Sequence, residues 1–194
     1  MGTDRLGEIL DAAYVCLTRH GVRRTTMEDI ARQAGMSRSA AYQYVQNKDD
    51  AFRRLAERVH ARALEAAGQA AGSRGSYAER ARGVLAVKFD LMRRLAEVSP
   101  HARELLACGP EVCAGFAGEL KVLLGGIFAE AGLEDPAEAA EICLALVAGL
   151  ETVPDGARLL SPAADALIAG LLIGSGPAGG SPPPLRGPRV NPTR

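Results

Sequence analysis

Tryptophan is absent from this 194-residue chain, and aromatic residues make up only 4% of it. Isoleucine, valine and threonine are also few beside alanine and leucine. Strands favour β-branched and aromatic side chains, whereas alanine and leucine are strong helix formers. The composition therefore predicts an all-helical protein, and the length allows one or two domains with a sizeable core.

Cysteine and histidine are also sparse, with four and three residues. The cysteines are too few and too scattered for a disulfide scaffold, and no pair has the two-residue spacing of a zinc or thioredoxin-type site. His20 and His60 are predicted at exposed helix positions. Because the chain shows no nucleophile–base pair and no ligand cluster, we expect neither an enzyme nor a bound metal or cofactor.

Long apolar runs are missing too. The N-terminal stretch carries acidic residues and no apolar run, which argues against a secretory signal. No segment approaches about 18 uninterrupted apolar residues, the length of a membrane span. We therefore expect a soluble, cytoplasmic protein with no membrane partner.

The formal net charge is zero, but the charges are unevenly distributed. Residues 1–62 contain 11 Lys and Arg against 8 Asp and Glu, whereas residues 63–194 contain 12 against 15. A mildly basic N-terminal part joined to a larger acidic part indicates a division of labour.

Amphipathic spacing predicts a first helix over residues 4–19, ended near Gly21, and a long helix from Asp49 to about Gly68. Further helices follow a loop at 72–76. We expect their prolines, Pro162 included, to lie in the first turn of a helix, where proline is tolerated. The expected segments are 77–98, 100–107, 111–131, 136–153 and 162–173. The Gly/Pro-rich residues 174–194 are predicted to be a disordered tail.

Segment 26–48 is the most informative part of the sequence. Two short helices, over 27–34 and 38–45, are expected on either side of a turn, with Thr26 and Ser37 as their N-caps and Gly35 at positive φ in the turn. Such a pair is the helix-turn-helix arrangement. The positions expected to face inward are Ile30, Ala31, Ala34, Met36, Ala41 and Val45.

The opposite face of the second short helix carries a different set of side chains. Arg38, Ser39, Tyr42 and Gln43 are expected to point outward. An outward tyrosine beside arginine, serine and glutamine suits contact with phosphates and base edges.

At these residues the chain resembles the TetR family of bacterial transcriptional regulators. The family pattern is a threonine start, an Ile-Ala-x-x-Ala-Gly-apolar-Ser turn, then Tyr-x-Tyr-apolar and a lysine. Here it reads Thr26, residues 30–37, residues 42–45 and Lys48, and the likeness extends over about residues 5–58. Ala41 and Val45 depart from the larger aliphatic residue and the phenylalanine that are usual in the family.

The resemblance implies an all-α fold with a division into parts. A three-helix helix-turn-helix DNA-binding domain is expected over residues 1–48 and a connecting helix over 49–68. A helical effector-binding and dimerisation domain is expected over 77–173. The implied function is that of a DNA-binding regulator, a repressor released from a palindromic operator by a small, mostly apolar effector.

The resemblance also assigns roles on double-stranded operator DNA. Thr26, Tyr42 and Lys48 would contact phosphates, and Ser37 would cap the recognition helix. Tyr44 would contact the backbone or pack under the helix. Bases would be faced by Arg38, Ser39, Ala40 and Gln43, for which guanine and adenine are the natural partners of the arginine and the glutamine.

The larger part is expected to bind the effector and to form a homodimer. Two apolar faces on 137–153 and small residues four apart on 162–174 predict the dimer interface, with Leu144, Val147, Leu167, Gly170 and Leu171. Candidate pocket residues come from the middle helices, although such residues more often belong to a core. They are Phe89, Met92, His101, Cys108, Cys113, Phe116 and Phe128.

Two alternatives remain. A helical protein-interaction scaffold would explain the second part, but not the combination of Thr26, Tyr42 and Lys48. A redox-sensing regulator would use Cys108 and Cys113, whose spacing matches no standard metal site. Binding to heparin and duplex DNA separates a regulator from a scaffold or an enzyme.

Overall fold

The computed structural model describes residues 4–101, 103–107 and 109–174. In these ranges the regular structure is helical, with no strand, as the composition predicts. Apart from Gly174, the predicted tail lies outside the described residues, as does Cys108. The helices are α1 (Arg5–Arg24), α2 (Met27–Gln33), α3 (Arg38–Ala41), α4 (Lys48–Ala71), α5 (Tyr77–Val98), α6 (Glu104–Ala107), α7 (Pro110–Glu130), α8 (Pro136–Leu150) and α9 (Gly156–Gly174).

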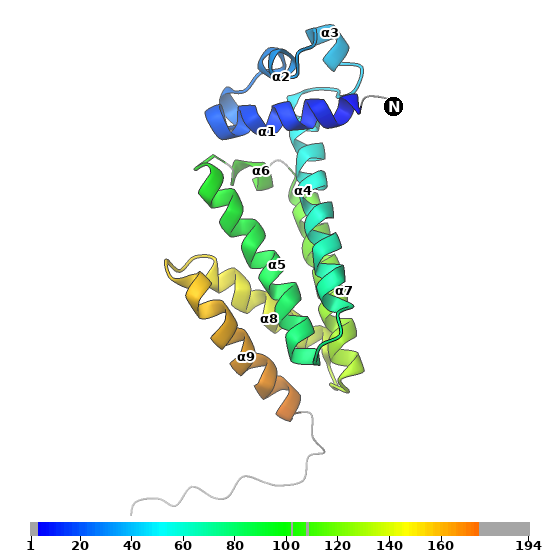
Figure 1. Cartoon of the computed structure of the whole chain (residues 1–194), viewed down its shortest axis with the longest axis vertical. Helices are drawn as coiled ribbons and strands as arrows, with labels where there is room; N and C mark the ends of the chain where they lie inside the picture. The colour runs from blue at the N-terminus through cyan, green and yellow to red at the C-terminus, as the bar shows by residue number, and fades with distance from the viewer. Residues whose placement is uncertain (1–3, 102, 108, 175–194) are drawn as a thin grey trace, which may run out of the picture.

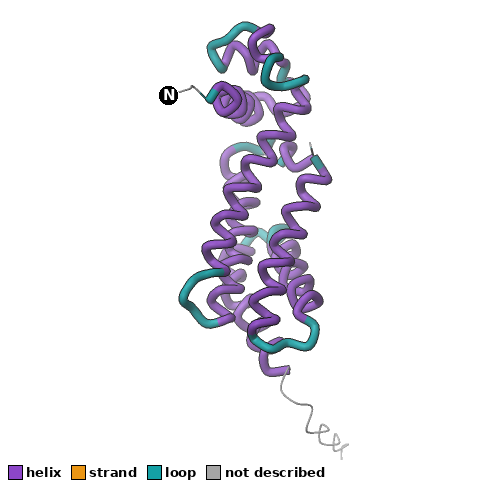
Figure 2. The backbone as a smooth tube through the Cα atoms, turned by 90° about the vertical axis from the view of Figure 1, so that its right-hand side faces the viewer, coloured by secondary structure: helices purple, strands orange, loops and turns teal. Residues whose placement is uncertain are grey.

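The molecule is elongated, with α1, α2 and α3 gathered at one end (Figure 1). Helix α4 leaves this end and runs into a body of long helices, an arrangement that Figure 2 shows from the side. In the body, α5 packs against α4, α7, α8 and α9, and α7 also packs against α4 and α8. The long helix α4 therefore belongs to both parts.

Two separate hydrophobic clusters correspond to these parts. The N-terminal core combines buried residues of α1 to α3 with the first turns of α4, among them Ile9, Leu17, Ile30 and Phe52. The C-terminal core combines α5, α7, α8 and α9 with the end of α4, and its fully buried side chains include Leu85, Leu120, Leu124, Phe128 and Ile168.

The connection between α5 and α7 returns to the N-terminal part. Leu105 of α6 is fully buried in the N-terminal core. The Ser99 hydroxyl donates to the Thr18 carbonyl at 2.9 Å, and the Val22 amide donates to Glu104 Oε2 at 2.9 Å. The body thus contacts the N-terminal part both through α4 and through this connection.

Several predicted helix limits are wrong. Helix α1 continues to Arg24, because Gly21 (φ 75°, ψ 167°) bends the chain and a short helical stretch follows it. A Cβ at Gly21 would lie 3.0 Å from His101 Nδ1 and from Glu104 Oε1, so these two side chains leave little room for a larger residue at the bend. Helix α4 extends beyond Gly68 to Ala71. The segment predicted over 100–107 is helical only from Glu104.

The last helix differs most from the prediction. It begins at Gly156 rather than at residue 162, which places Pro162 inside the helix instead of in its first turn. Proline lacks the amide hydrogen that would bond to the carbonyl one turn earlier, so this helix carries a gap in its hydrogen-bond ladder.

The prediction that His60 occupies an exposed helix position is also wrong. It is buried, with 4% of its surface exposed, and its ring stacks on Phe116 with centroids 4.5 Å apart and planes 6° from parallel. Burial lowers the pKa of His60 because the charged imidazolium loses its solvation. The apolar side of α7 covers this face of α4.

Two helices of the body are strongly apolar along their whole length. By length and composition alone, α7 and α9 could each cross a membrane. Helix α7, however, places Leu120, Leu124 and Phe128 in the C-terminal core. Much of the remaining apolar surface of both helices is exposed, including Val122 (70%) and Ile173 (80%).

Candidate nucleic-acid interface

The turn between α2 and α3 is a Schellman motif. Gly35 has φ 67°, the Gly35 amide donates to the Arg32 carbonyl at 3.1 Å, and the Met36 amide donates to the Ala31 carbonyl at 3.0 Å. A side chain at positive φ would be strained, which explains the glycine. Met36 packs on the N-terminal core, so the turn fixes the direction in which α3 leaves α2.

Both short helices begin at the predicted N-caps. The Thr26 hydroxyl accepts from the Asp29 amide at 3.2 Å, and the Asp29 carboxylate accepts from the Thr26 amide at 3.0 Å, which completes a capping box. Hydrogen bonds from the Thr26 hydroxyl and amide lower the pKa of Asp29. Ser37 accepts from the Ala40 amide at 3.2 Å. Each such cap is worth about 1 kcal/mol, so these residues define where the helices start.

The outward face of α3 carries the side chains expected there. Ser37, Arg38, Ser39, Tyr42, Gln43 and Tyr44 are exposed, and Ala40 is half-buried. The predicted inward residues Ala41 and Val45 are buried at 0% and 2% exposure. The helix is shorter than predicted, because after Ala41 the amides of Gln43 and Tyr44 bond three residues back rather than four.

Arg38 and Tyr42 form a preformed pair on this face. Arg38 Nη2 donates to the Tyr42 hydroxyl at 3.2 Å, and the guanidinium carbon lies 5.5 Å from the centre of the tyrosine ring. The hydrogen bond to Tyr42 raises the pKa of Arg38. Both side chains are thereby held in position at the surface, with guanidinium hydrogens still pointing outward for an anion or a base edge.

Lys48 is held against the end of α1. Its ammonium donates to the carbonyls of Val22 (3.1 Å), Thr25 (3.3 Å) and Arg23 (3.4 Å). An ammonium has three donors, so these contacts satisfy it, and they also cap carbonyls at the C-terminal end of α1, where a helix leaves its last carbonyls without intrahelical partners. Lys48 thus has a structural role that the sequence did not reveal.

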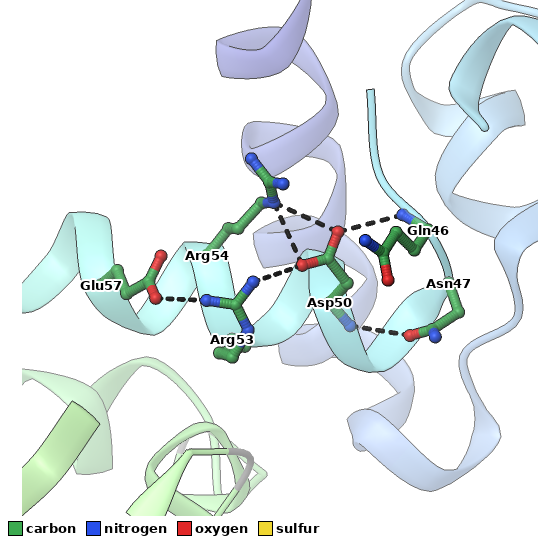
Figure 3. Close-up of polar contacts among 6 residues, drawn as sticks. All are labelled: Gln46, Asn47, Asp50, Arg53, Arg54 and Glu57. Atoms are coloured by element: carbon green, nitrogen blue, oxygen red, sulfur yellow. Dashed lines mark hydrogen bonds and ion pairs between the residues drawn. The ribbon is translucent and has the colours of Figure 1, made fainter. Parts of the chain in front are cut away.

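Asp50, in the first turn of α4, links this helix to Gln46, which lies between α3 and α4 (Figure 3). Its carboxylate, only 8% exposed, accepts from the Gln46 amide at 3.0 Å, from Arg53 Nη2 at 2.5 Å and from Arg54 Nε at 3.1 Å. Burial alone would raise the pKa of Asp50, but these hydrogen bonds outweigh it and lower the pKa. Arg53 also donates to Glu57.

The comparisons with known proteins agree with this geometry. Residues 9–55 match the family model for bacterial regulatory proteins of the tetR family. An uncharacterized helix-turn-helix-type transcriptional regulator, YfiR of Bacillus subtilis, is 40% identical over 53 residues, a match that spans 27% of this chain and 26% of that relative.

Solved structures extend the likeness to the whole fold. SmeT, the repressor of a Stenotrophomonas maltophilia multidrug efflux pump, has a TM-score of 0.66 and 25% identity over 93% of this chain and 96% of its own. A putative transcriptional regulator of Pseudomonas aeruginosa has a TM-score of 0.73 and 22% identity over 90% and 93% of the two chains. Over residues 9–55 the chain is therefore of the TetR type, and its whole fold is that of these solved regulators.

The predicted pocket residues do not come together in this structure. Phe116 and Phe128 lie in the C-terminal core, so they are corrected to core residues. Phe89 and Met92 line a cavity of about 420 Å³ beside the α8–α9 connection. His101 Nδ1 instead lies 2.9 Å from Glu104 Oε1, at the junction with α1.

The remaining pocket candidates are Cys108, which lies outside the described residues, and Cys113; Cys143 was not a candidate and is considered beside them as a further thiol. Cys113 is half-buried, and both burial and the negative charge of Glu111 raise the pKa of its thiol. Burial raises the pKa of Cys143 to about 11. Reactive cysteines have a lowered pKa, so neither thiol resembles a redox sensor.

The predicted dimer residues also separate into two groups. Val147 is fully buried in the C-terminal core and cannot offer surface to a partner, so its assignment is wrong. Leu144, Leu167 and Leu171 are half-buried, and Gly170 is exposed. Ile142 of α8 (40% exposed) and Ile173 of α9 (80%) were not assigned to the interface, yet they are among the exposed large apolar residues of the described chain.

Sequence reasoning also missed the network of Asp50 and a group of arginines near the junction of α1, α4 and α5. The signal for the first was the spacing of Asp50, Arg53 and Arg54, since residues three and four apart share one face of a helix. The arginines, Arg58 and Arg62, lie one turn apart on α4, beside Leu55 and Val59.

Proposed function

We propose that this chain is a DNA-binding transcriptional regulator, a homodimeric repressor that a small, mostly apolar effector releases from a palindromic operator. The exposed face of α3 carries this proposal. Arg38 lies on α3 and Tyr42 and Gln43 lie in the turn that directly follows it, and this segment is held by a cap, a Schellman turn and a buried inner face. A rigid, exposed helix bearing hydrogen-bond donors is what reading a major groove requires.

The contacts proposed on DNA follow this face. Arg38, Ser39, Ala40 and Gln43 face base edges, and Tyr42 holds a phosphate. Tyr44, exposed at 39%, lies at the end of the turn and reaches the sugar–phosphate backbone. Thr26 and Ser37 present helix N-termini, at which amide groups and the helix dipole favour phosphate.

Lys48 contributes to phosphate binding from its docked position. Lys48 is half-buried, with its ammonium against the carbonyls at the end of α1, one of which belongs to the exposed Arg23. We therefore propose that Lys48 acts on DNA mainly through its charge.

Dimerisation is supported by unpartnered apolar surface on α8 and α9. Ile142, Gly170 and Ile173 are exposed there, and a single surface helix needs only one apolar face. A two-fold dimer would place two recognition helices about 34–36 Å apart on two half-sites. SmeT was solved in complex with triclosan, a precedent in this fold for the binding of a small molecule.

Selection of duplex DNA from a random pool tests the proposal. A palindromic consensus is expected, and Gln43→Ala should relax the preference at one base pair per half-site by about 1–3 kcal/mol. Gln69→Ala, an exposed glutamine near the end of α4, is the matched control and should leave the consensus unchanged. No enrichment of any sequence, or a monomeric mass by light scattering at micromolar concentration, would contradict the proposal.

A further inference from the structure

A cavity of about 500 Å³ lies between α1, α4 and α5. Figure 1 shows α4 and α5 diverging toward the end of the molecule that carries α1. The cavity contains none of the residues that the sequence assigned to an effector. It lies instead where the two hydrophobic cores meet.

The walls of this cavity are mostly apolar. The aliphatic side chains come from facing sides of two helices, and the half-buried Tyr14 of α1 lies at one end. A volume of this order is typical of small-molecule sites, which hold about 300–1,000 Å³. The wall residues are Leu55, Val59 and Ala63 of α4 and Val87, Leu91 and Leu95 of α5.

The polar lining of the cavity is predominantly cationic. Arg62 and Arg94 make no ion pair or side-chain hydrogen bond within the described parts of the chain. Asp90, the acidic residue of the lining, is already paired with Arg93 at 3.2 Å. Two uncompensated guanidinium groups therefore border an apolar cavity.

Arg58 adds a third guanidinium with an unused donor. Its Nη1 donates to the Gly7 carbonyl at 3.3 Å and its Nη2 to Asp11 Oδ1 at 2.7 Å, which ties α4 to α1. Its Nε is buried and has no hydrogen-bond partner among the described residues. A buried donor without a partner is costly, and an acceptor brought by a ligand would satisfy it.

We propose that this cavity binds an amphipathic carboxylate, with the apolar body between α4 and α5 and the anionic head among Arg58, Arg62 and Arg94. This deepens the effector part of the proposed function and rests on it only for the consequence on DNA. Arginine suits a carboxylate head because its planar guanidinium donates two parallel hydrogen bonds.

The position of the head gives the ligand access to the N-terminal part. A carboxylate at Arg58 competes with Asp11, whose side chain is 74% exposed, for the same guanidinium. The apolar body at the same time touches Tyr14 of α1 and the inner face of α5. Binding therefore changes how α1 is held on α4, and with it the orientation of α3.

Calorimetry on the full chain tests the site with octanoate, decanoate and dodecanoate, each below its micelle-forming concentration. At least one carboxylate is expected to bind, with decanol weaker and decyltrimethylammonium at least about tenfold weaker than decanoate because the cavity is cationic. No binding by any carboxylate, or equal binding of decanoate and the cationic probe, overturns the proposal.

Variants locate the binding. Arg62→Gln combined with Arg94→Gln is expected to weaken decanoate about tenfold or more, and Ala63→Leu, which fills the cavity, should abolish its binding. Arg74→Gln, an exposed arginine in the loop after α4, is the matched control and should bind like the parent. Circular dichroism confirms that each variant is folded. Unchanged affinity in both cavity variants overturns the proposal.

Duplex DNA selected as above separates the two hypotheses. If decanoate binds but does not release the duplex, the cavity assignment holds and its role as the effector site of the proposed function fails. If no duplex is bound at all, the proposed function fails, and calorimetry alone decides the cavity.

Discussion

In the N-terminal core, short helices are held by side-chain caps, a Schellman turn and an ammonium docked on carbonyls, whereas the C-terminal core is held by long helices packed through aliphatic and aromatic side chains. The caps, the turn and the docked ammonium of the N-terminal part fix the backbone from which its surface side chains project. The packing of the C-terminal core tolerates exchange of one aliphatic residue for another of similar size.

The difference also appears at the surface. The N-terminal part exposes arginine, serine, glutamine and tyrosine on α3 and on the turn after it, while the C-terminal part exposes aliphatic residues on α7, α8 and α9. Exposed polar groups on a rigid helix suit a polar partner such as DNA, and exposed apolar faces suit a second copy of the chain. One chain thus carries two surfaces with different partner chemistry.

The largest expected effect comes from emptying either core. Phe52→Ala in the N-terminal core and Phe128→Ala in the C-terminal core each remove a fully buried ring and should each cost about 3–5 kcal/mol of unfolding free energy. Hydrogen exchange followed by mass spectrometry should show faster exchange mainly in α1 to α3 for the first variant and mainly in α7 and α8 for the second.

The same two variants test whether the two cores unfold separately. If either substitution accelerates exchange equally in both parts, the two cores open as one unit. In that case the contacts of Leu105 and α4 would outweigh the separation of the two clusters.

A smaller loss of stability is expected from a substitution of Asp50, whose hydrogen bond to the Gln46 amide holds the segment after α3 on α4. Asp50→Asn removes the negative charge from two guanidinium groups and should cost about 1–3 kcal/mol in urea unfolding at pH 7. Because its pKa is lowered in the folded chain, this stabilisation is present above the ordinary pKa of about 4 and is lost as the pH falls through the folded value.

The neighbouring Asp49 provides the control for this prediction. Asp49 is exposed in the same first turn of α4, so Asp49→Asn should change stability by only a few tenths of a kcal/mol. Equal losses for the two variants would show that the helix dipole, rather than the buried network, accounts for the effect.

The sequence was most informative where residue type and backbone geometry are tightly coupled. Thr26, Ser37 and Gly35 each satisfy a local requirement, a cap or a positive φ, that few other residues meet. Together with the inward Ala41 and Val45 they predicted the helix-turn-helix and its outward face correctly.

The sequence was least informative where the outcome depends on which helices meet. Phe116 was assigned to the pocket as an aromatic residue of a middle helix, and no local pattern reveals that its stacking partner, His60, comes from a distant helix. The cavity at Arg58 and Tyr14 depends on the divergence of α4 and α5, which no local pattern encodes. Lys48 was assigned to phosphate from the family resemblance, and its contacts with the carbonyls of Val22, Arg23 and Thr25 left no local signal because they join positions more than twenty residues apart.

Lys48→Ala distinguishes the structural role of Lys48, measured by stability, from its proposed role in DNA binding, measured by the salt dependence. Loss of the ammonium should cost about 1–2 kcal/mol of unfolding free energy, since three carbonyls lose a charged donor. The slope of log K for DNA against log salt should fall by about 0.9, independent of sequence.

Lys121→Ala on α7 is the control: it removes only an ion pair with Glu141 at the surface, so both measurements should stay near those of the parent. A stability loss with an unchanged salt slope would restrict Lys48 to capping α1. An altered base preference would contradict the phosphate assignment as well.

The smallest effect concerns His60 at the boundary of the two cores. Burial lowers its pKa, so below about pH 6.5 the unfolded chain takes up a proton that the folded chain refuses. Its stabilising contribution is therefore complete above that pH and declines as the pH falls toward the folded pKa, by up to about 1.4 kcal/mol per pH unit. Urea unfolding between pH 7.5 and 5 should show this decline in the parent, while His60→Gln should flatten it.

His20→Gln, at the exposed histidine of α1, should follow the parent curve, because this ring is not enclosed. Parallel curves for the parent and His60→Gln would mean that protonated His60 is accommodated against Phe116, and that the contact between α4 and α7 is looser than the stacked rings indicate.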